Sequence, residues 1–374
     1  MGLRVLITNI ELWPPSGTVL YVRDLALELQ RQGHRPAIFS AAGGGIAEEL
    51  GAAGIPVTDR PDRLPWTPDI VHAHHHAPAL LALRTWPATP AIFICHDHSS
   101  EDDRAPLEPQ VRRYFGVSQV CVDRLLRDGA PSERTGLLLN FVDTARFRPR
   151  GPLPLRPRRA LVFSNYAHVG SHLPAVTEAC RQAGLELDVV GLSAGTLALR
   201  PEEVLGQYDI VFAKARAAIE AMAVGAAVVL CDFAGAGPLV TSGEFDDLRP
   251  QNFGFAALRQ PLQPEFLVRE IARYDPVDAE RIRDRVRAEA SVAATVARLV
   301  EIYNLVVAEH QGEEWRTGTP GPRPGRPFPI RELSYLRLAW AWRAVPREHR
   351  NRLKRLPGAE QIRRGVRRLL GESG

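Results

Sequence analysis

In YDIVFAKARAAIEAMAVGAAVVLCD, residues 208–232, a helical segment lies between two short apolar runs. The runs, residues 208–213 and 226–231, have the continuous apolar character of strands that are buried on both faces of a sheet. A helix is expected to begin directly after the first run, with Glu220 in its first turns. A strand, a helix and a second strand in this order are typical of a parallel α/β sheet.

The same alternation extends over most of the chain. Further strands are expected at residues 3–8, 36–41, 69–74, 91–97 and 114–118, and then at 160–165 and 185–192. Helical patterns separate them, as in residues 18–33, whose apolar positions fall on one helical face. We therefore predict an α/β fold with two doubly wound, Rossmann-like domains facing a cleft.

Residues 148–159, rich in proline and arginine, interrupt the alternation because they cannot continue a helix or a sheet. We therefore place one Rossmann-like domain at residues 1–150 and a second at residues 156–310. A segment rich in proline and glycine, residues 311–329, is predicted to be an extended linker. Residues 330–374 form a basic tail that contains aromatic side chains.

The composition is typical of a soluble globular protein, since 45% of the 374 residues are hydrophobic and 24% are charged. No apolar run reaches the roughly 18 to 20 residues that a transmembrane helix needs. The N-terminus has the pattern of a buried strand rather than of a signal peptide. The four cysteines lack CxxC spacing and are predicted to be buried free thiols in a reducing compartment, which places the protein in the cytoplasm.

The formal net charge of +4 arises from the tail, where arginines are interspersed with Trp340, Trp342 and other apolar residues. Such a basic amphipathic region suits docking on a membrane surface, here the inner face of the membrane. Packing back on the protein and a disordered basic end fit the same pattern. The rest of the chain is slightly acidic, and no nucleic-acid partner is expected.

Residues directly after the strands are the candidates for ligand binding, because ligands of open parallel sheets bind beyond the carboxyl ends of the strands. At the start of the quoted helix, the backbone amides of residues 215–218 would attract an anion such as a phosphate. Lys214 and Arg216 would add positive charge, and Glu220 could accept hydrogen bonds from the two hydroxyls of a ribose. The alternative is that Glu220 caps the helix and Lys214 is only solvated.

A second candidate for anion binding, Ser16-Gly17-Thr18, lies between the first strand and its helix. Its backbone amides would also be available to an anion. The segment does not match GxGxxG, so a dinucleotide-binding site has no direct support. An ordinary N-capped loop between strand and helix is the alternative.

Histidines are dense at the ends of two expected strands, where HAHHH contains His72, His74, His75 and His76, and HDH contains His96 and His98. We expect these to be neighbouring strands. Three interpretations fit: a transition-metal site completed by Asp97, an acid/base or sugar-binding role, and histidines bonded to the backbone at strand ends. The metal site is the weakest, because HExxH is absent from the sequence and side chains on one strand alternate faces.

Together these segments resemble the family-4-like glycosyltransferases of the GT-B fold. SGTVLYVRDLALELQRQGHRP is similar to the Gly-rich loop and first helix of that family, and PDIVHAH and AIFICHD are similar to a pair of its strands. GVSQVCVDRLLRDG, followed by LLLNFVDTARFRP, resembles the pattern GVS…NGVD…RF. EAMAVGAAVV resembles EAMAxGxPVV, and RDRVRAEASVAATVARLVEIYNLVV resembles the closing helices. The resemblance covers residues 3–308.

The resemblance implies an enzyme that transfers a sugar of hexosyl type from a nucleotide-diphosphate sugar to an acceptor. The family usually acts with retention and without an essential metal, so no cofactor besides the donor is expected. Residues 156–310 would bind the donor, with Glu220 at the ribose and the amides of Ala217 and Ala218 at the diphosphate.

By the same resemblance, residues 1–150 would form the acceptor side. Gly17 would approach the donor phosphate, and His96 would lie beside the transferred sugar as a catalytic residue. The acceptor would be a glycan, a lipid-linked glycan or a small molecule, as in the synthesis of bacterial envelope glycans.

The chain departs from the family at two points. The family pattern E-x7-E ends in the EAMA glutamate, but its first glutamate falls on Phe212 here, inside a strand. The usual arginine and lysine after the first strand of the second domain are replaced by Asn165, which is a candidate donor-binding residue, and His168. We predict that Lys214, as a catalytic residue, or Arg216 supplies the missing charge.

Two other functions fit the same residues. A nucleotide-sugar 2-epimerase shares the fold, but carries a Ser-Gly-Gly phosphate turn where this chain has Ala215-Arg216-Ala217. A non-catalytic homologue would bind a nucleotide sugar, or a partner, without turnover. Acceptor-dependent release of a nucleoside diphosphate separates the three functions.

Overall fold

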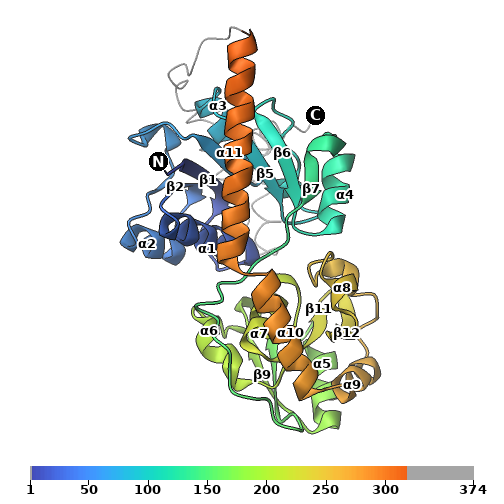
Figure 1. The fold of residues 1–374 in the computed structure, drawn as a ribbon. Coiled ribbons are helices and arrows are strands. Elements are labelled where there is room, and N and C mark those ends of the chain that lie inside the picture. Colours follow the sequence, from blue (N-terminus) through green and yellow to red (C-terminus); the bar gives the residue numbers. More distant parts are fainter. Residues whose placement is uncertain (1, 318–374) are drawn as a thin grey trace, which may run out of the picture. The chain divides into compact units, whose positions relative to one another are not determined.

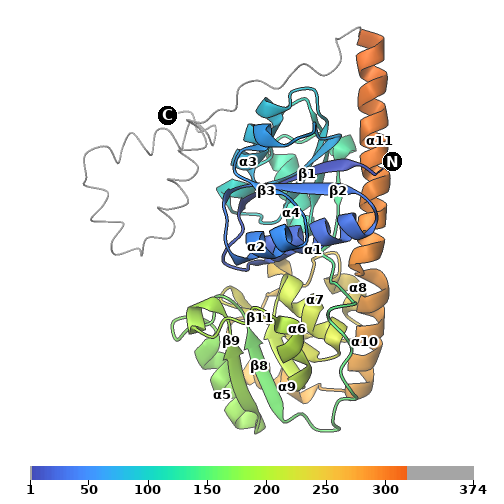
Figure 2. The same ribbon diagram turned by 90° about the vertical axis from the view of Figure 1, so that its left-hand side faces the viewer.

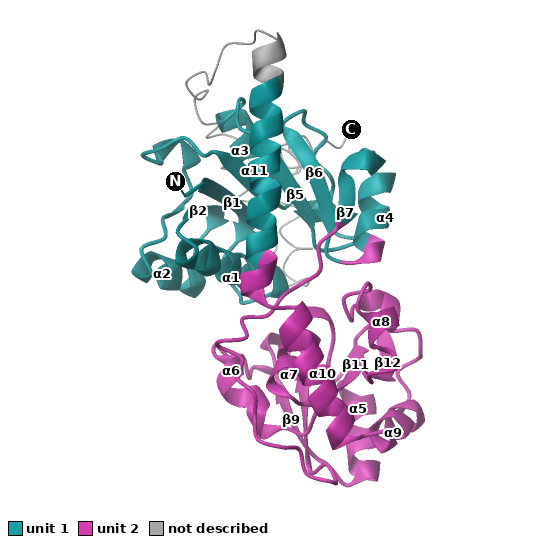
Figure 3. Ribbon diagram, viewed as in Figure 1, with its two compact units in different colours: residues 1–117, 121–136, 296–374 teal, residues 118–120, 137–295 magenta. Residues whose placement is uncertain are grey.

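The computed structural model describes residues 2–317, which form two compact units (Figure 3). Of the described residues, unit 1 contains residues 2–117, 121–136 and 296–317, and unit 2 contains residues 118–120 and 137–295. Each unit is built on a sheet of its own. The predicted tail at residues 330–374 lies outside the described residues.

Unit 1 contains a seven-stranded sheet with the strand order β3-β2-β1-β4-β5-β6-β7. Its strands are β1 (Arg4–Glu11), β2 (Arg35–Ala42), β3 (Val57–Thr58), β4 (Ile70–His74), β5 (Ala91–Cys95), β6 (Val111–Gly116) and β7 (Thr135–Leu137). The pairs from β3 to β6 are parallel. This 3-2-1-4-5-6 order is that of a doubly wound sheet, and the direction of winding reverses between β1 and β4.

Helices connect these strands and cover the sheet of unit 1 (Figures 1 and 2). They are α1 (Gly17–Arg31), α2 (Gly45–Ala52), α3 (His76–Thr85), α4 (Gln119–Arg127) and most of α11 (Val292–Thr317), with short 3₁₀ turns at Pro61–Arg63, Glu101–Asp103 and Ser132–Arg134. Helix α11 packs Val296, Leu299, Tyr303 and Val306 into the protein, where each is fully buried. Burial of each such side chain stabilises the fold by about 1.5–3 kcal/mol.

Unit 2 contains a five-stranded sheet with the order β12-β11-β10-β8-β9. Its strands are β8 (Arg159–Phe163), β9 (Glu186–Val190), β10 (Ile210–Ala213), β11 (Ala227–Asp232) and β12 (Gly235–Leu239). All pairs are parallel except the antiparallel β11–β12 pair. Counted within the unit, this is the order 2-1-3-4-5, the other common arrangement of a doubly wound sheet, whose winding reverses between β8 and β10.

The sheet of unit 2 separates two hydrophobic cores. Along β10, Val211 and Ala213 belong to one core, and Ile210 and Phe212 belong to the other. The first core is completed by α7 (Ala215–Val224) and α10 (Pro276–Glu289), and the second by α5 (Leu173–Ala183) and α9 (Pro264–Ala272). Shorter helices lie at Leu192–Ala194, Pro201–Val204, Leu205–Gln207, Phe245–Leu248 and Phe255–Ala257. Both faces are therefore covered, which confirms the predicted doubly wound architecture.

The domain boundaries differ from those predicted at residues 1–150 and 156–310. Unit 2 already begins at residue 137, and the chain returns to unit 1 at residue 296. The predicted linker is also wrong at its start, because α11 continues to Thr317. Just before the predicted start of the linker, the helix contacts other parts of unit 1: Glu309 forms an ion pair with Arg113, and His310 Nε2 lies 3.0 Å from the carbonyl of Ala88.

Two composition-based expectations can be compared with the described residues. All four cysteines are buried and none forms a disulfide, as predicted. Within residues 2–317, no helix combines the length and the apolar character needed to cross a membrane.

Candidate functional site

In each sheet, ligands are expected beyond the carboxyl ends of the two strands between which the winding reverses, and we call this place the switch point. In unit 1 this point lies beyond the ends of β1 and β4. Ser16 lies after β1, and His74 is the last residue of β4. In unit 2 it lies beyond β8 and β10, where Ser164 and Lys214 follow the strands. Of the residues predicted from the sequence, Ser16 and Lys214 therefore lie at the two switch points, each within its own unit, whereas His96 follows β5, the neighbour of β4.

In unit 2 the polar groups gather around Asp232, the last residue of β11. Its carboxylate lies 3.0 Å from Lys214 Nζ and accepts hydrogen bonds from Ser164 Oγ (3.2 Å) and the amide of Phe233 (2.8 Å). Asp232 is 1% exposed, whereas 17% of the Lys214 side chain is exposed. The predicted cation is thus held by a buried carboxylate, which the sequence analysis did not identify.

Three aromatic rings surround Lys214. Its ammonium group lies 4.2 Å from the ring centroid of Phe255 and 5.6 Å from that of Tyr166, which are cation–π distances. Phe233 contacts both of these rings edge-on, with centroids 5.1 and 5.8 Å apart. Tyr166 is 54% exposed and Phe233 is 47% exposed. These rings, Tyr166, Phe233 and Phe255, form what we call the aromatic patch, and it offers stacking surface to a planar ligand.

His172 lies behind this cluster at the start of α5. It is fully buried, and its Nδ1 is 3.8 Å from a carboxylate oxygen of Asp232. Among the described residues, neither ring nitrogen has a hydrogen-bond partner. Burial lowers the pKa of His172, and the attraction of Asp232 opposes this effect only in part. The ring is therefore neutral near pH 7 and adds no positive charge beside Lys214.

The start of α7 is only partly available to an anion. The amide of Ala215 donates to the carbonyl of Phe253 at 2.8 Å, and the amide of Ala218 donates to Lys214. Anion binding here therefore depends on the amides of Arg216 and Ala217 rather than on all four predicted amides. Ala215 also has a φ of 51°, a left-handed conformation that costs an L-residue about 1–2 kcal/mol. Such strain is concentrated at functional sites.

Arg216 and Glu220 form a buried ion pair along α7. Arg216 Nε donates to Glu220 Oε1 at 2.8 Å, and the two residues are 4% and 1% exposed. The guanidinium group also lies over the ring of Phe141, 5.7 Å from its centroid. Arg216 is therefore directed along the helix, and a ribose bound at Glu220 would share the carboxylate with it. The i, i+4 spacing was visible in the sequence, but the burial was not.

Asn165 and His168, which replace the expected cations after β8, both accept hydrogen bonds from backbone amides. Asn165 Oδ1 accepts a hydrogen bond from the amide of Leu192 at 3.1 Å. His168 Nδ1 accepts one from the amide of Gly170 at 3.0 Å. The structure therefore shows Asn165 fixing the loop after β9, and its predicted contact with a donor stays a prediction.

In unit 1, Ser16 caps α1 by accepting a hydrogen bond from the amide of Val19 at 3.4 Å. This matches the alternative of an N-capped loop. Gly17 is exposed, and a Cβ atom built on it would meet no atom within 4 Å. Gly17 and Thr18 thus begin a helix of 15 residues with open space in front of Gly17. The capping role of Ser16 and an anion site at this helix start are compatible.

The histidines divide into two groups. His75 and His76 bond to the backbone, since Nδ1 of His75 accepts from the amide of Ile10 and Nδ1 of His76 lies 3.0 Å from the carbonyl of Arg104. His72 and His74 instead lie on one face of β4, and their ring centroids are 4.7 Å apart. His74 Nδ1 lies 2.7 Å from His96 Nε2, which confirms that the two histidine segments end neighbouring strands.

Metal binding by the histidines finds no geometric support in the part of the chain that the structure describes. It contains no group of three His, Cys, Asp or Glu side chains arranged to hold a metal ion. Burial also lowers the pKa of His72 to about 3 and holds that of His74 well below its usual range, in His74 with a contribution from the neighbouring histidines. Both rings are therefore neutral at physiological pH.

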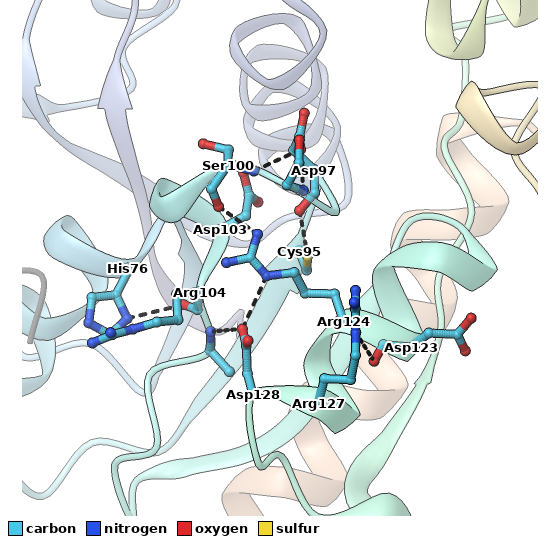
Figure 4. A network of polar contacts seen from close by, with 12 residues as sticks. His76, Cys95, Asp97, Ser100, Asp103, Arg104, Asp123, Arg124, Arg127 and Asp128 are labelled. Carbon is cyan, nitrogen blue, oxygen red and sulfur yellow. Dashed lines mark hydrogen bonds and ion pairs between the residues drawn. The ribbon is translucent and has the colours of Figure 1, made fainter. Parts of the chain in front are cut away.

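A polar network fixes the loop that carries His96 (Figure 4). Asp103, which is 2% exposed, accepts a hydrogen bond from the amide of His96 at 2.6 Å. Asp97 accepts from the amides of Ser99 and Ser100, and Arg124 donates to the carbonyl of Ser100 at 2.7 Å. The loop is consequently held at several points, one of them the amide of His96 itself, as positioning of a catalytic group requires.

Comparison with known proteins places this geometry in context. Residues 15–146 match the sequence model of Glycosyltransferase Family 4. Among curated proteins, no sequence matches the chain. This match covers only the N-terminal part of the chain, and it supports the expectation of an enzyme of this type.

Solved structures extend the comparison to both units. A glycosyltransferase from Rickettsia africae ESF-5 has 17% identity and a TM-score of 0.59, over 82% of this chain and 99% of that one. Anabaena Alr3699/HepE, in complex with UDP and glucose, has 13% identity and a TM-score of 0.59, over 81% and 99%. Sucrose-phosphate synthase from Thermosynechococcus elongatus has 15% identity and a TM-score of 0.57, over 82% and 100%. The fold is therefore that of GT-B glycosyltransferases, which confirms the resemblance read from the sequence.

Proposed function

We propose that this protein transfers a sugar from a nucleotide-diphosphate sugar to an acceptor, with retention. The observation that carries the proposal is the arrangement at the switch point of unit 2. There a cation, Lys214, a strained helix start at Ala215 and an exposed aromatic patch lie together. A diphosphate needs the first two, and a nucleobase suits the third.

Each donor-binding residue takes one part of the ligand. The amides of Arg216 and Ala217 face the diphosphate, Glu220 binds the ribose hydroxyls beside Arg216, and Asn165 borders the same site. Lys214 stabilises the negative charge that develops on the leaving diphosphate when the bond from the sugar C1 to the phosphate oxygen breaks. A new bond forms between C1 and an acceptor oxygen, whose proton passes to the departing phosphate.

Unit 1 contributes the remaining roles. Gly17 has the open space that a phosphate requires, with Ser16 and Thr18 on either side. His96 is the candidate for contact with the transferred sugar, because its loop is held by Asp103 and its ring by His74. No metal or other cofactor enters the proposed reaction.

The acceptor follows from the resemblance alone. A glycan, a lipid-linked glycan or a small molecule of the bacterial envelope is proposed, with the reaction in the cytoplasm or at the inner face of the membrane. The solved structures of Anabaena HepE hold UDP and UDP-glucose, so uridine nucleotides are the first donors to test here.

A second function, nucleotide-sugar binding without turnover, is favoured by one observation. Both charged groups of the donor site have partners within the protein, Lys214 in Asp232 and Glu220 in Arg216. A Lys214 already paired with Asp232 stabilises the charge that develops on a leaving diphosphate less strongly, which would impair turnover. An epimerase, the third candidate, would interconvert the sugar without any acceptor.

Calorimetric titration with UDP, GDP, ADP and CMP tests the proposal. We expect one nucleoside diphosphate to bind, and Glu220→Gln to weaken it at least about tenfold because hydrogen bonds to a carboxylate are lost. Glu178→Gln, at an exposed position of α5, is the matched control. Release of the same diphosphate only in the presence of an acceptor supports transfer. Binding without release supports the non-catalytic function, and no binding at all would overturn both.

A further inference from the structure

His74 and His96 form a hydrogen bond that links a buried ring to a half-exposed one. His74 is fully buried at the end of β4, and its Nδ1 lies 2.7 Å from Nε2 of His96. The ring of Tyr21, from α1, stands edge-on against both imidazoles, with centroids 5.2 and 5.0 Å away. One nitrogen of the candidate catalytic histidine is therefore committed to a protein partner.

The direction of this hydrogen bond follows from the other nitrogen of His74. In the described part of the chain, His74 Nε2 is buried and has no hydrogen-bond partner. A buried N–H group without a partner is more costly than a buried acceptor without one. The proton of neutral His74 therefore belongs on Nδ1, which then donates to His96.

We infer that His74 is a positioning residue for His96: its Nδ1–H donates to His96 Nε2 and holds neutral His96 in the Nδ1–H tautomer. The hydrogen bond made by one ring nitrogen determines which nitrogen carries the proton. The other ring nitrogen of His96, Nδ1, consequently carries the proton and can donate a hydrogen bond but not accept one. For the proposed transfer, on which this part of the inference rests, His96 acts as a hydrogen-bond donor to a sugar oxygen and not as a general base.

The surroundings keep the pair in this state. His74 stays neutral because it is buried beside His72. His72 is itself bound through Nδ1 to the hydroxyl of Tyr303, at 2.5 Å, and does not compete for His96. On the other side of His96, Asp103 accepts from the backbone amide at 2.6 Å, and burial raises the pKa of its carboxyl group well above the usual value.

Nitrogen NMR of the full chain labelled in the histidine rings tests the inference directly. The His96 signals are assigned by their loss in His96→Asn, and the spectra are recorded near neutral pH. We expect His96 as the Nδ1–H tautomer, with the non-protonated nitrogen at Nε2. Finding the Nε2–H tautomer in the unmodified protein would overturn the inference, and this measurement depends on no variant that must fold with an altered core.

His74→Leu and His72→Leu then form a matched pair. Both histidines are fully buried on the same face of β4, and the hydrogen bond with His96 is made by His74. We expect His96 to lose the Nδ1–H preference in His74→Leu and to keep it in His72→Leu. The same change in both variants would mean that the core, and not this hydrogen bond, sets the tautomer.

Turnover gives a separate readout. We expect His74→Leu to lower acceptor-dependent kcat about tenfold with little change in donor affinity, and His72→Leu to leave kcat within about threefold. If the NMR result holds but no turnover is found with any donor, the positioning role stands and the proposed transfer fails. If turnover is found and His96 is the Nε2–H tautomer, the transfer stands and the positioning role fails.

Discussion

The carboxylate of Asp232, at the end of β11, lies 3.0 Å from the ammonium group of Lys214, which follows the neighbouring parallel strand β10. Lys214 is thereby fixed in place, but part of its charge is cancelled before a diphosphate arrives. The ion pair therefore orients Lys214 but weakens its attraction for an anion, and this loss of attraction can be measured.

Asp232→Asn should strengthen the binding of inorganic pyrophosphate about threefold to tenfold, because the charge of Lys214 is no longer compensated. The amide oxygen can still accept from Ser164 and Phe233, so the local structure is maintained. Calorimetry gives the affinity, and Asp188→Asn, half-exposed on β9, is the control. Weaker pyrophosphate binding in Asp232→Asn would show that Lys214 does not face the anion.

Phe233→Ala should weaken the binding of a nucleoside diphosphate about tenfold and leave pyrophosphate binding unchanged. The reason is that stacking of a base on an aromatic ring contributes about 1–3 kcal/mol, and pyrophosphate has no base. Titration with both ligands makes the comparison. Leu199→Ala removes another exposed apolar side chain of unit 2 and should change neither affinity. Equal losses for both ligands would place the diphosphate, not the base, at the aromatic patch.

Arg216→Met should lower the free energy of unfolding by about 3–5 kcal/mol, because it leaves the carboxylate of Glu220 buried without its cation. The comparison is Arg181→Met on α5, whose partner Glu178 is exposed and whose ion pair contributes less than about 1 kcal/mol. Urea unfolding of both variants tests this difference. Similar stabilities would mean that Glu220 is solvated after the change.

Gly17→Ala should leave stability unchanged within about 0.5 kcal/mol, since a Cβ atom there meets no protein atom within 4 Å. Donor turnover should nevertheless fall, because the added methyl group occupies the space proposed for a phosphate. Thermal melting and product release are measured on the same preparation. Full activity in this stable variant would remove Gly17 from the donor site.

Acidification should destabilise the protein through its buried histidines. Burial lowers the pKa of His72 to about 3 and that of His76 to about 4. An unfolded histidine binds a proton below about pH 6.5, so the unfolded chain gains protons that the folded chain does not, and stability falls as the pH decreases from about 6.5 to 4.

His72→Leu isolates one of these protons. Its unfolding free energy should depend on pH less steeply, by about 1 kcal/mol per pH unit between about pH 6 and pH 4. Urea unfolding at several pH values compares the variant with the unmodified chain. Asp103 and the other acidic groups contribute equally to the pH dependence of both proteins, so their effect cancels in the difference. Parallel pH profiles would show that His72 takes up its proton without unfolding.

Much of this architecture could be predicted from the sequence, because apolar runs such as residues 208–213 specify buried strands directly. The proximity of His74 and His96 followed from the same reasoning, since neighbouring strands end at one edge. Asp232 was missed because a lone carboxylate after a strand has no pattern that names its partner. The end of α11 was missed as well, because the composition after residue 311 suggested a linker, whereas the helix continues to Thr317.

The path of α11 has a consequence for biosynthesis. Most of unit 1 leaves the ribosome first, but its core includes Tyr303, which binds His72 from a segment translated after the whole of unit 2. The first unit to be synthesised is therefore the last to be completed. A nascent chain that stops at residue 295 would carry β4 without its covering helix, and separate expression of the two halves would have to graft residues 296–312 onto the first.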